Sequence, residues 1–265
     1  MSAAVEPAAD LVGEPKVQPV IELDDVHASY GQFQALFGIT LRVGQGRALA
    51  VVGHNGMGKT TLARVASGLV VPTSGRVLMR GVDLTGRPAH EFALAGIAHA
   101  TEGRSVFSSL TVSENLTLVF RRRFGRGGVH AALERVFELF PRLGERRTQL
   151  AGSLSGGEQR MLTLARVMVL EPTVLIADEL SLGLAPIITE EVYKLLGRIK
   201  ETGTSMIVIE QHVHHALDVC DDAVVIDRGL VVYNGPATDR DRLMAAFTHV
   251  DDAPADESPD VAPQG

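Results

Sequence analysis

One run of eight residues has the composition of a phosphate-binding loop. Gly53-His54-Asn55-Gly56-Met57-Gly58-Lys59-Thr60 matches the pattern Gly-x-x-x-x-Gly-Lys-Ser/Thr in full. Glycines let consecutive backbone N–H groups turn inward around phosphate groups, and a following helix adds the positive end of its dipole. We expect Lys59 to reach the β and γ phosphates of a nucleotide, and the Thr60 hydroxyl to bind Mg²⁺. The full match disfavours a glycine-rich turn that binds nothing.

Two neighbouring carboxylates supply groups that phosphoryl transfer needs beside such a loop. Asp178 and Glu179 close the apolar run 173–177, about 120 residues after the loop. Asp178 can hold Mg²⁺ through water, and Glu179 is suited to accept a proton from the attacking water. Because neighbouring residues of a strand point to opposite faces, Glu179 is expected to turn away from the side of Asp178.

The loop lies in the context that a phosphate site requires. Residues 47–53 form an apolar strand that enters the loop, and residues 59–69 continue as a helix. Before them, residues 20–31 and 34–46 alternate in polarity and end in glycine turns, which predicts an antiparallel sheet.

The second half of the chain predicts an α/β fold. Residues 173–178, 205–211 and 222–229 are short runs rich in valine and isoleucine, separated by helical segments. This alternation predicts a parallel sheet covered on both faces. Helical periodicity within about 103–160 predicts a small helical insertion.

The composition is that of a globular protein. The 265 residues are 45% hydrophobic and 22% charged, enough for one large domain or two closely joined subdomains. The net charge of −7 argues against nucleic-acid binding, because proteins that hold a phosphate backbone usually present a basic face. Cys220 is the only cysteine, so no internal disulfide can form, and we expect a partly buried apolar residue in a reducing compartment.

Both ends of the chain differ from its centre. Residues 1–18 and 250–265 are acidic and contain proline, and we expect them to be disordered tails around a folded domain at 19–249. The N-terminus has no cationic start before an apolar stretch, so it predicts no signal peptide. No run of about 18 apolar residues predicts a membrane span, so a membrane role is expected through partners.

A third motif resembles the signature of one family of phosphate-loop proteins, the ABC ATPases. It is the run Leu154-Ser155-Gly156-Gly157-Glu158-Gln159-Arg160, and the resemblance extends over residues 20–236. It implies a P-loop (RecA-like) parallel-sheet core with an antiparallel β subdomain and a small α-helical insertion. In that family the signature, at a helix N-terminus, closes on the γ-phosphate held by another subunit. The resemblance therefore implies a head-to-tail dimer with two ATP sites.

The resemblance also implies roles for single residues. The ATP-binding residues would be Tyr30, Gly53, His54, Asn55, Gly56, Met57, Gly58, Lys59, Thr60, Thr61 and Glu102. Tyr30 matches the aromatic residue that stacks on adenine. The residues that would contact the ATP of the partner site are Ser155, Gly156, Gly157 and Glu158. Mg²⁺ would be held by Thr60, Asp178 and Glu102. His54 and Met57 stand at free positions of the motif, to which no side-chain chemistry is assigned.

Several positions depart from the family pattern. By gapless counting from neighbouring motifs, Glu102 replaces the usual glutamine that senses Mg²⁺, and Gln211 replaces the usual switch histidine. His212 follows directly, but a shift of one residue reverses side-chain direction at a strand end. The catalytic residues are therefore Glu179 with Gln211 or His212, and the choice stays open. Residues 181–185 hold the place of the dimer-contact loop without its usual aspartate.

Short stretches place the chain within the family. Residues 102–104, 110–116 and 149–154 look like those of the smaller ATPase subunit of branched-chain amino acid importers. That resemblance implies a homodimer, or a heterodimer with a sister ATPase, together with two transmembrane permease subunits and a substrate-binding protein. It places the chain at the cytoplasmic face of the inner membrane, without nucleic acid. The arginines within 121–126 are expected to be a solvated loop face, with a permease or lipid-headgroup contact as the alternative.

Two other functions stay open. An exporter or lipid-extraction ATPase would use the same chemistry with different membrane partners. A soluble, non-transport ABC protein is disfavoured, because such proteins usually carry two cassettes or long insertions.

Overall fold

The computed structural model describes residues 18–101, 106–168, 171–211 and 213–248, with the side chains of 122 and 123 left out. The elements run from Pro19 to Thr248, within the domain expected at 19–249. The expected tails, apart from residue 18, lie outside the described residues, as do Glu102 and His212.

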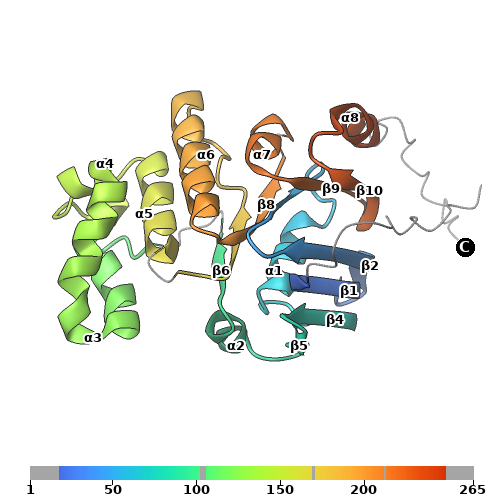
Figure 1. Ribbon diagram of the computed structural model, residues 1–265, viewed down its shortest axis with the longest axis horizontal. Helices are drawn as coiled ribbons and strands as arrows, with labels where there is room; N and C mark the ends of the chain where they lie inside the picture. The colour runs from blue at the N-terminus through green and yellow to red at the C-terminus, as the bar shows by residue number, and fades with distance from the viewer. Residues whose placement is uncertain (1–17, 102–105, 169–170, 212, 249–265) are drawn as a thin grey trace, which may run out of the picture.

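The larger sheet lies at the centre of the molecule (Figure 1). Its strand order is β10–β9–β3–β8–β7–β6. The last five run parallel, while β10 pairs antiparallel with β9. The strands are β3 Ala48–Val52, β6 Ile97–Ala100, β7 Val174–Asp178, β8 Ser205–Glu210, β9 Asp222–Asp227 and β10 Leu230–Pro236. The expected parallel sheet is confirmed, and β10 adds an antiparallel edge strand that the apolar runs did not indicate.

Apolar side chains fill both faces of this sheet, because successive residues of a strand point to opposite sides. In β3, Ala48, Ala50 and Val52 belong to one hydrophobic core, while Leu49 and Val51 belong to another. The first core packs against the helices that follow β6 in the chain. The second packs against α1 (Lys59–Ala66) and the antiparallel sheet. A continuous apolar run therefore signals a strand buried on both sides.

The smaller sheet is antiparallel, as expected from the alternation near the N-terminus. Its order is β2–β1–β4–β5. Its strands are β1 Pro19–Tyr30, β2 Phe33–Gly44, β4 Ser74–Met79 and β5 Val82–Asp83. In Figure 1 it lies beside α1, on the side of the larger sheet away from α6 and α7.

The helices fall into two groups in Figure 1, where α3, α4 and α5 stand together at one end of the molecule. Their bounds are α1 Lys59–Ala66, α2 Ala89–Leu94, α3 Val112–Leu139, α4 Pro141–Glu145, α5 Gly156–Met168, α6 Pro186–Glu201, α7 Val213–Val219 and α8 Arg240–Thr248, with a 3-10 turn η1 at Ala151–Ser153. A capping box of Thr111 and Glu114 starts α3, and Gly125 interrupts it with a non-helical backbone. The described part of the expected insertion thus consists mainly of helices, joined by short turns. No described helix is long and apolar enough to cross a membrane.

The glycine-rich loop between β3 and α1 is fastened to the β9–β10 turn. The amide of Gly229 donates to the Met57 carbonyl at 3.0 Å, and the Gly229 carbonyl accepts from the Phe37 amide at 2.9 Å. At Gly58, φ is 101°, and an added Cβ would lie 2.8 Å from the Ala35 carbonyl oxygen. Close backbone packing therefore fixes the loop between β2 and the β9–β10 turn.

We predict that Gly58→Ala destabilises the protein more than Gly56→Ala. Both glycines have positive φ, but an added Cβ at Gly56 would meet open space. Backbone strain alone costs about 1–3 kcal/mol, and overpacking at Gly58 adds about 1–3 kcal/mol. Urea unfolding of the two variants measures the difference, and equal losses would contradict the close packing described for the loop.

Candidate functional site

Lys59 is the first residue of α1, and its ammonium group is buried inside the glycine-rich loop. Its residue is 3% exposed. Nζ donates to the His54 carbonyl at 2.9 Å and lies 3.7 Å from Oε1 of Glu179. Burial lowers the pKa of Lys59, while the carboxylates of Glu179, Asp178 and Glu210 oppose that shift. The loop thus presents a desolvated cation, which is suited to an anionic phosphate.

The carboxylates of Asp178 and Glu179, at the end of the apolar strand β7, both interact electrostatically with the ammonium group of Lys59. Asp178 ends β7 and is 3% exposed. Glu179 has φ of 49° and donates its amide to the Ile209 carbonyl at 2.9 Å. The expectation that the two side chains take opposite sides is wrong, because the left-handed backbone at Glu179 ends the alternation of the strand. Glu179 therefore approaches Lys59 from the same side of the sheet that Asp178 faces.

The residues present fit a magnesium ion at the end of β7. Oδ1 of Asp178 is buried and has no hydrogen-bond partner among the described residues. Mg²⁺ usually keeps several waters and takes one or two carboxylates plus substrate phosphates, so it needs no cage of protein ligands. Thr60, exposed at the start of α1, and Asp178 would hold it, while Glu102 lies outside the described residues.

A second buried carboxylate joins the ends of β7 and β8. Glu210 is 3% exposed and accepts from the Ser181 hydroxyl at 2.8 Å and from the Ser181 amide at 3.2 Å. Glu210 therefore ties the loop after Glu179 to the end of β8, directly before Gln211. No sequence motif predicts this role of Glu210, because its partner Ser181 is 29 residues away.

The signature residues start α5 through a capping box. The Ser155 amide and hydroxyl each donate to Oε2 of Glu158 at 2.9 Å, and Arg146 lies 2.6 Å from that carboxylate. Burial opposes ionisation of Glu158, but these hydrogen bonds and Arg146 outweigh it and lower the pKa of Glu158. A Cβ on Gly157 would come within 2.4 Å of Ile188, so this glycine allows α5 to approach α6 closely. Ser155 and Gly156 remain exposed at the helix N-terminus.

The structure brings some predicted residues together and keeps others apart. Lys59, Asp178 and Glu179 converge at the phosphate loop, whereas α5 stands with α3 and α4 away from α1 (Figure 1). Tyr30 ends β1 and is 44% exposed, and Gln211 follows β8 half-buried. His54 stacks against Phe247 of α8 with ring centroids 4.5 Å apart. His212 lies outside the described residues.

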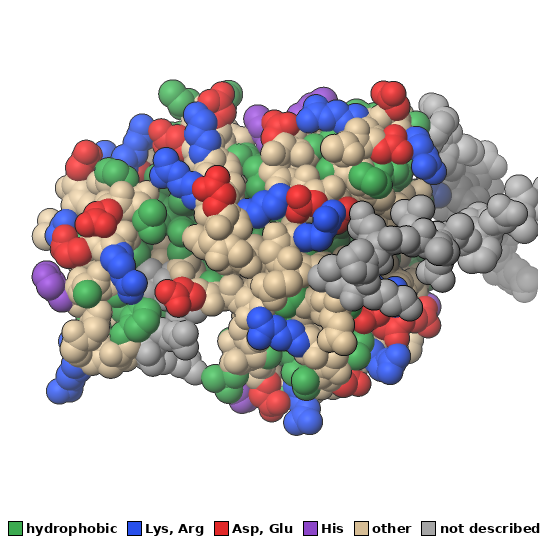
Figure 2. Space-filling view, in the orientation of Figure 1, with side chains coloured by type: hydrophobic (Ala, Val, Ile, Leu, Met, Phe, Trp, Pro, Cys, Tyr) green, Lys and Arg blue, Asp and Glu red, His purple; other side chains and the backbone are tan. Residues whose placement is uncertain are grey.

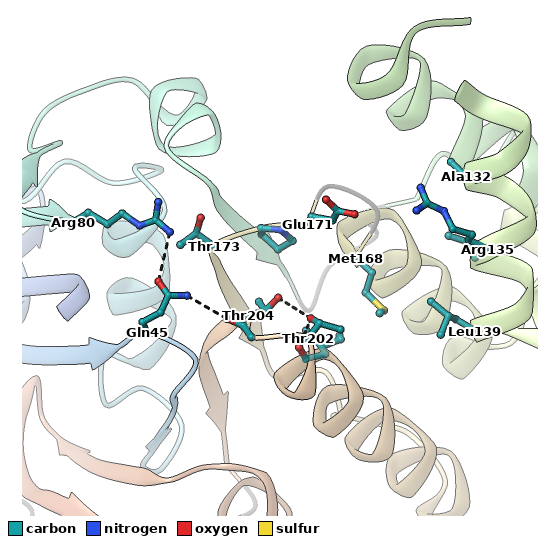
Figure 3. Close-up of a pocket in the computed structure, with 14 residues that line it drawn as sticks. Gln45, Arg80, Ala132, Arg135, Leu139, Met168, Glu171, Thr173, Thr202 and Thr204 are labelled. Carbon is teal, nitrogen blue, oxygen red and sulfur yellow. Dashed lines mark hydrogen bonds between the residues drawn. The ribbon is translucent and has the colours of Figure 1, made fainter. Parts of the chain in front are cut away.

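A cavity of about 480 Å³ lies at the opposite edge of the sheet, not at the loop. Figure 3 shows its walls, where Arg80 bonds Gln45 at 3.5 Å and Thr202 faces Thr204. Thr173 and Thr204 precede the first residues of β7 and β8, whereas ligands of parallel sheets bind outside the carboxyl ends. The loop at the carboxyl ends of the strands is therefore the better candidate for a nucleotide site.

Acidic and basic side chains are interspersed on the face shown in Figure 2, with no continuous basic stripe there.

Comparisons with known proteins agree with this geometry. The model of the ABC transporter family matches residues 36–181. The branched-chain amino acid transport ATP-binding protein BraG of Pseudomonas aeruginosa is 37% identical over 80% of this chain and 91% of its own. The probable branched-chain amino acid transport ATP-binding protein LivF of Archaeoglobus fulgidus is 34% identical over 81% and 91%. The lipopolysaccharide export system ATP-binding protein LptB of Haemophilus influenzae is 28% identical over 82% and 90%.

Solved structures show the same fold. The ADP conformation of MJ1267, an ATP-binding cassette of an ABC transporter, matches with a TM-score of 0.79 and 22% identity, over 88% of this chain and 98% of that one. The dimeric, post-hydrolysis cassette MJ0796 bound to ADP and Pi matches with a TM-score of 0.74 and 20% identity, over 82% and 98%. The chain therefore belongs to the ABC transporter family and is one of its ATP-binding, ATP-hydrolysing subunits.

Proposed function

We propose that this chain powers an ABC importer for branched-chain amino acids or related small polar solutes. The observation that carries the proposal is the likeness to two ATP-binding proteins of branched-chain amino acid transport, at 37% and 34% identity over about four fifths of this chain. The convergence of Lys59, Asp178 and Glu179 at one loop supplies the groups for hydrolysis.

In this proposal Lys59 and Glu179 exchange partners when ATP binds. Without nucleotide, the ammonium group rests on the His54 carbonyl and near Glu179. A bound phosphate is the stronger partner for a desolvated cation, so it draws Lys59 toward its β and γ oxygens. Glu179 can then accept a proton from the attacking water. A bound Mg²⁺ would neutralise charge on the phosphates, with Thr60 and Asp178 of this chain orienting it.

The complete site needs a second chain. One chain carries one phosphate loop and one signature, and these lie on separate parts of the molecule (Figure 1). The exposed Ser155 and Gly156 at the N-terminus of α5 would close on the γ-phosphate of a partner. The partner is another copy or a sister ATPase. A sister subunit is supported by a precedent among the relatives. In Pseudomonas aeruginosa, BraF and BraG are both branched-chain amino acid transport ATP-binding proteins, and they are 29% and 37% identical to this chain.

Membrane coupling would come from two permease subunits, with a substrate-binding protein delivering the solute. The chain would lie peripherally at the cytoplasmic face of the inner membrane. A docking role is supported by three exposed apolar side chains, since Leu94 at the end of α2, Phe107 before α3 and Leu118 in α3 are 78%, 51% and 49% exposed. Exposed apolar side chains of this size are suited to receive a permease loop.

We predict that Glu179→Gln binds ATP but hydrolyses it at least about 100-fold more slowly, because the proton acceptor is lost. The ATP-bound dimer should then accumulate and elute early from a sizing column. Glu190→Gln is the matched control, since Glu190 is 61% exposed on α6 and pairs only with Lys194 among the described residues. Normal hydrolysis by the Glu179 variant would mean that another group orients the water.

We predict that leucine, isoleucine or valine stimulates ATP hydrolysis when the chain is reconstituted with its permeases and binding protein in lipid vesicles. ATP binding would close the dimer and hydrolysis would reopen it, so a loaded binding protein should raise turnover. The second candidate function is export or lipid extraction, which the likeness to LptB favours. Stimulation by lipopolysaccharide, with no response to amino acids, would support that candidate instead.

A further inference from the structure

Three buried polar side chains from three elements line up behind the end of β7. They are Ser67 at the end of α1, His99 in β6 and Asp178 in β7. Ser67 Oγ lies 3.0 Å from Nδ1 of His99, and Nε2 of His99 lies 3.6 Å from Oδ2 of Asp178. The side chains of His99 and Asp178 are 8% and 5% exposed. This row connects the helix after the phosphate loop to the carboxylate at the strand end.

The register of the sheet creates this row. His99 pairs with Ile176 across the parallel β6–β7 ladder. Residues two apart on a strand share a face, so His99, Ile176 and Asp178 all point toward α1. Ile176 belongs to the core that α1 packs against, in agreement with this direction.

The Ser67 hydroxyl has a single proton and lies near three groups that could accept it. These are the Ala63 carbonyl at 2.8 Å, the Arg64 carbonyl at 3.2 Å and Nδ1 of His99 at 3.0 Å. The Ala63 carbonyl also accepts from the Ser67 amide at 3.1 Å, so it keeps a partner when the hydroxyl turns to His99. In the arrangement that we infer, the hydroxyl donates to Nδ1. A neutral imidazole then carries its proton on Nε2, directed at Oδ2 of Asp178.

Within the part of the chain that the structure describes, two buried atoms of this row lack hydrogen-bond partners, namely Nε2 of His99 and Oδ1 of Asp178. At 3.6 Å, Nε2 and Oδ2 are too far apart for a formed hydrogen bond, which needs about 2.7–3.2 Å. An unsatisfied buried polar atom costs about 1–3 kcal/mol. An aliphatic side chain at this position, like the neighbouring Ile97 and Ile176, would avoid that cost. We therefore expect the His99 imidazole to hydrogen-bond the carboxylate of Asp178, and not simply to fill space in the core.

We propose that His99 is a positioning residue for the magnesium-binding carboxylate. Its Nε2–H, oriented by Ser67, holds Oδ2 of Asp178 and leaves Oδ1 directed at the metal's hydration shell. The contact shortens when the nucleotide site is filled, as hydrogen bonds of active sites commonly do. The inference rests on the proposed function in one respect, namely that Asp178 serves the magnesium nucleotide.

The test compares His99→Leu with His99→Gln in the full-length chain. Leucine fills the space without a donor, whereas glutamine returns an amide N–H near the position of Nε2. Calorimetric titration with ADP, in EDTA and across a series of Mg²⁺ concentrations, separates nucleotide affinity from the metal's contribution. We expect His99→Leu to need about tenfold more Mg²⁺ for half-maximal tightening of ADP, and His99→Gln to stay within about threefold of wild type. Metal-free ADP affinity should not change in either variant.

Controls separate this role from folding and from the proposed function. His27→Leu, on the antiparallel sheet, should leave the Mg²⁺ dependence as in wild type. Asp178→Asn should abolish the tightening by Mg²⁺, and if it does not, the proposed metal site itself is wrong. If Asp178→Asn abolishes it and His99→Leu behaves as wild type, only the role of His99 is overturned.

A second measurement needs no variant. Two-bond ¹H–¹⁵N correlations of the histidine rings in ¹⁵N-labelled wild-type protein report the tautomer of His99. We expect the proton on Nε2, and a neutral ring protonated on Nδ1 would overturn the inference, because Nε2 could not then donate to Asp178.

Discussion

The ammonium group of Lys59 is held out of water where the phosphate loop meets the end of β7, and the arrangement of the site depends on it. A buried cation is costly unless polar groups compensate it, and here the His54 carbonyl and Glu179 do so. These partners are weaker than a phosphate, so the site is prepared for an anion. Burial is the main cause of the lowered pKa of Lys59, since it disfavours the charged form.

The parallel sheet explains why chemically active residues meet there. Strands β3, β7 and β8 end at the same edge of the sheet. Gly53 follows β3, while Asp178 and Glu210 are the last residues of β7 and β8. Their apolar sequences bury both faces and leave only the carboxyl ends for polar side chains. Glu210 then ties the loop after Glu179 to β8, so that the segments after β7 and β8 share one buried carboxylate.

Much of this arrangement could be predicted from the sequence because its signals are local. The strand–loop–helix around Gly53–Thr60 and the valine-rich runs each specify their own element. The roles of His99 and Glu210 could not be predicted, since each depends on a partner in another element, brought near by strand register or loop packing. The side of Glu179 was also mispredicted, because strand alternation gives no sign of its positive φ. The roles of Glu102, Gln211 and His212 stay predictions, and only Gln211 of the three lies within the described residues.

The most direct test of the account is the affinity of Lys59→Ala for ATP, ADP and AMP, measured by calorimetry beside the wild-type chain. If the buried ammonium recognises the β and γ phosphates, the variant should lose ATP and ADP affinity by about 1.5–3 kcal/mol, or roughly 10–150-fold, with little change for AMP. Unchanged ATP affinity in a folded variant would contradict the central claim that the site is built around this lysine.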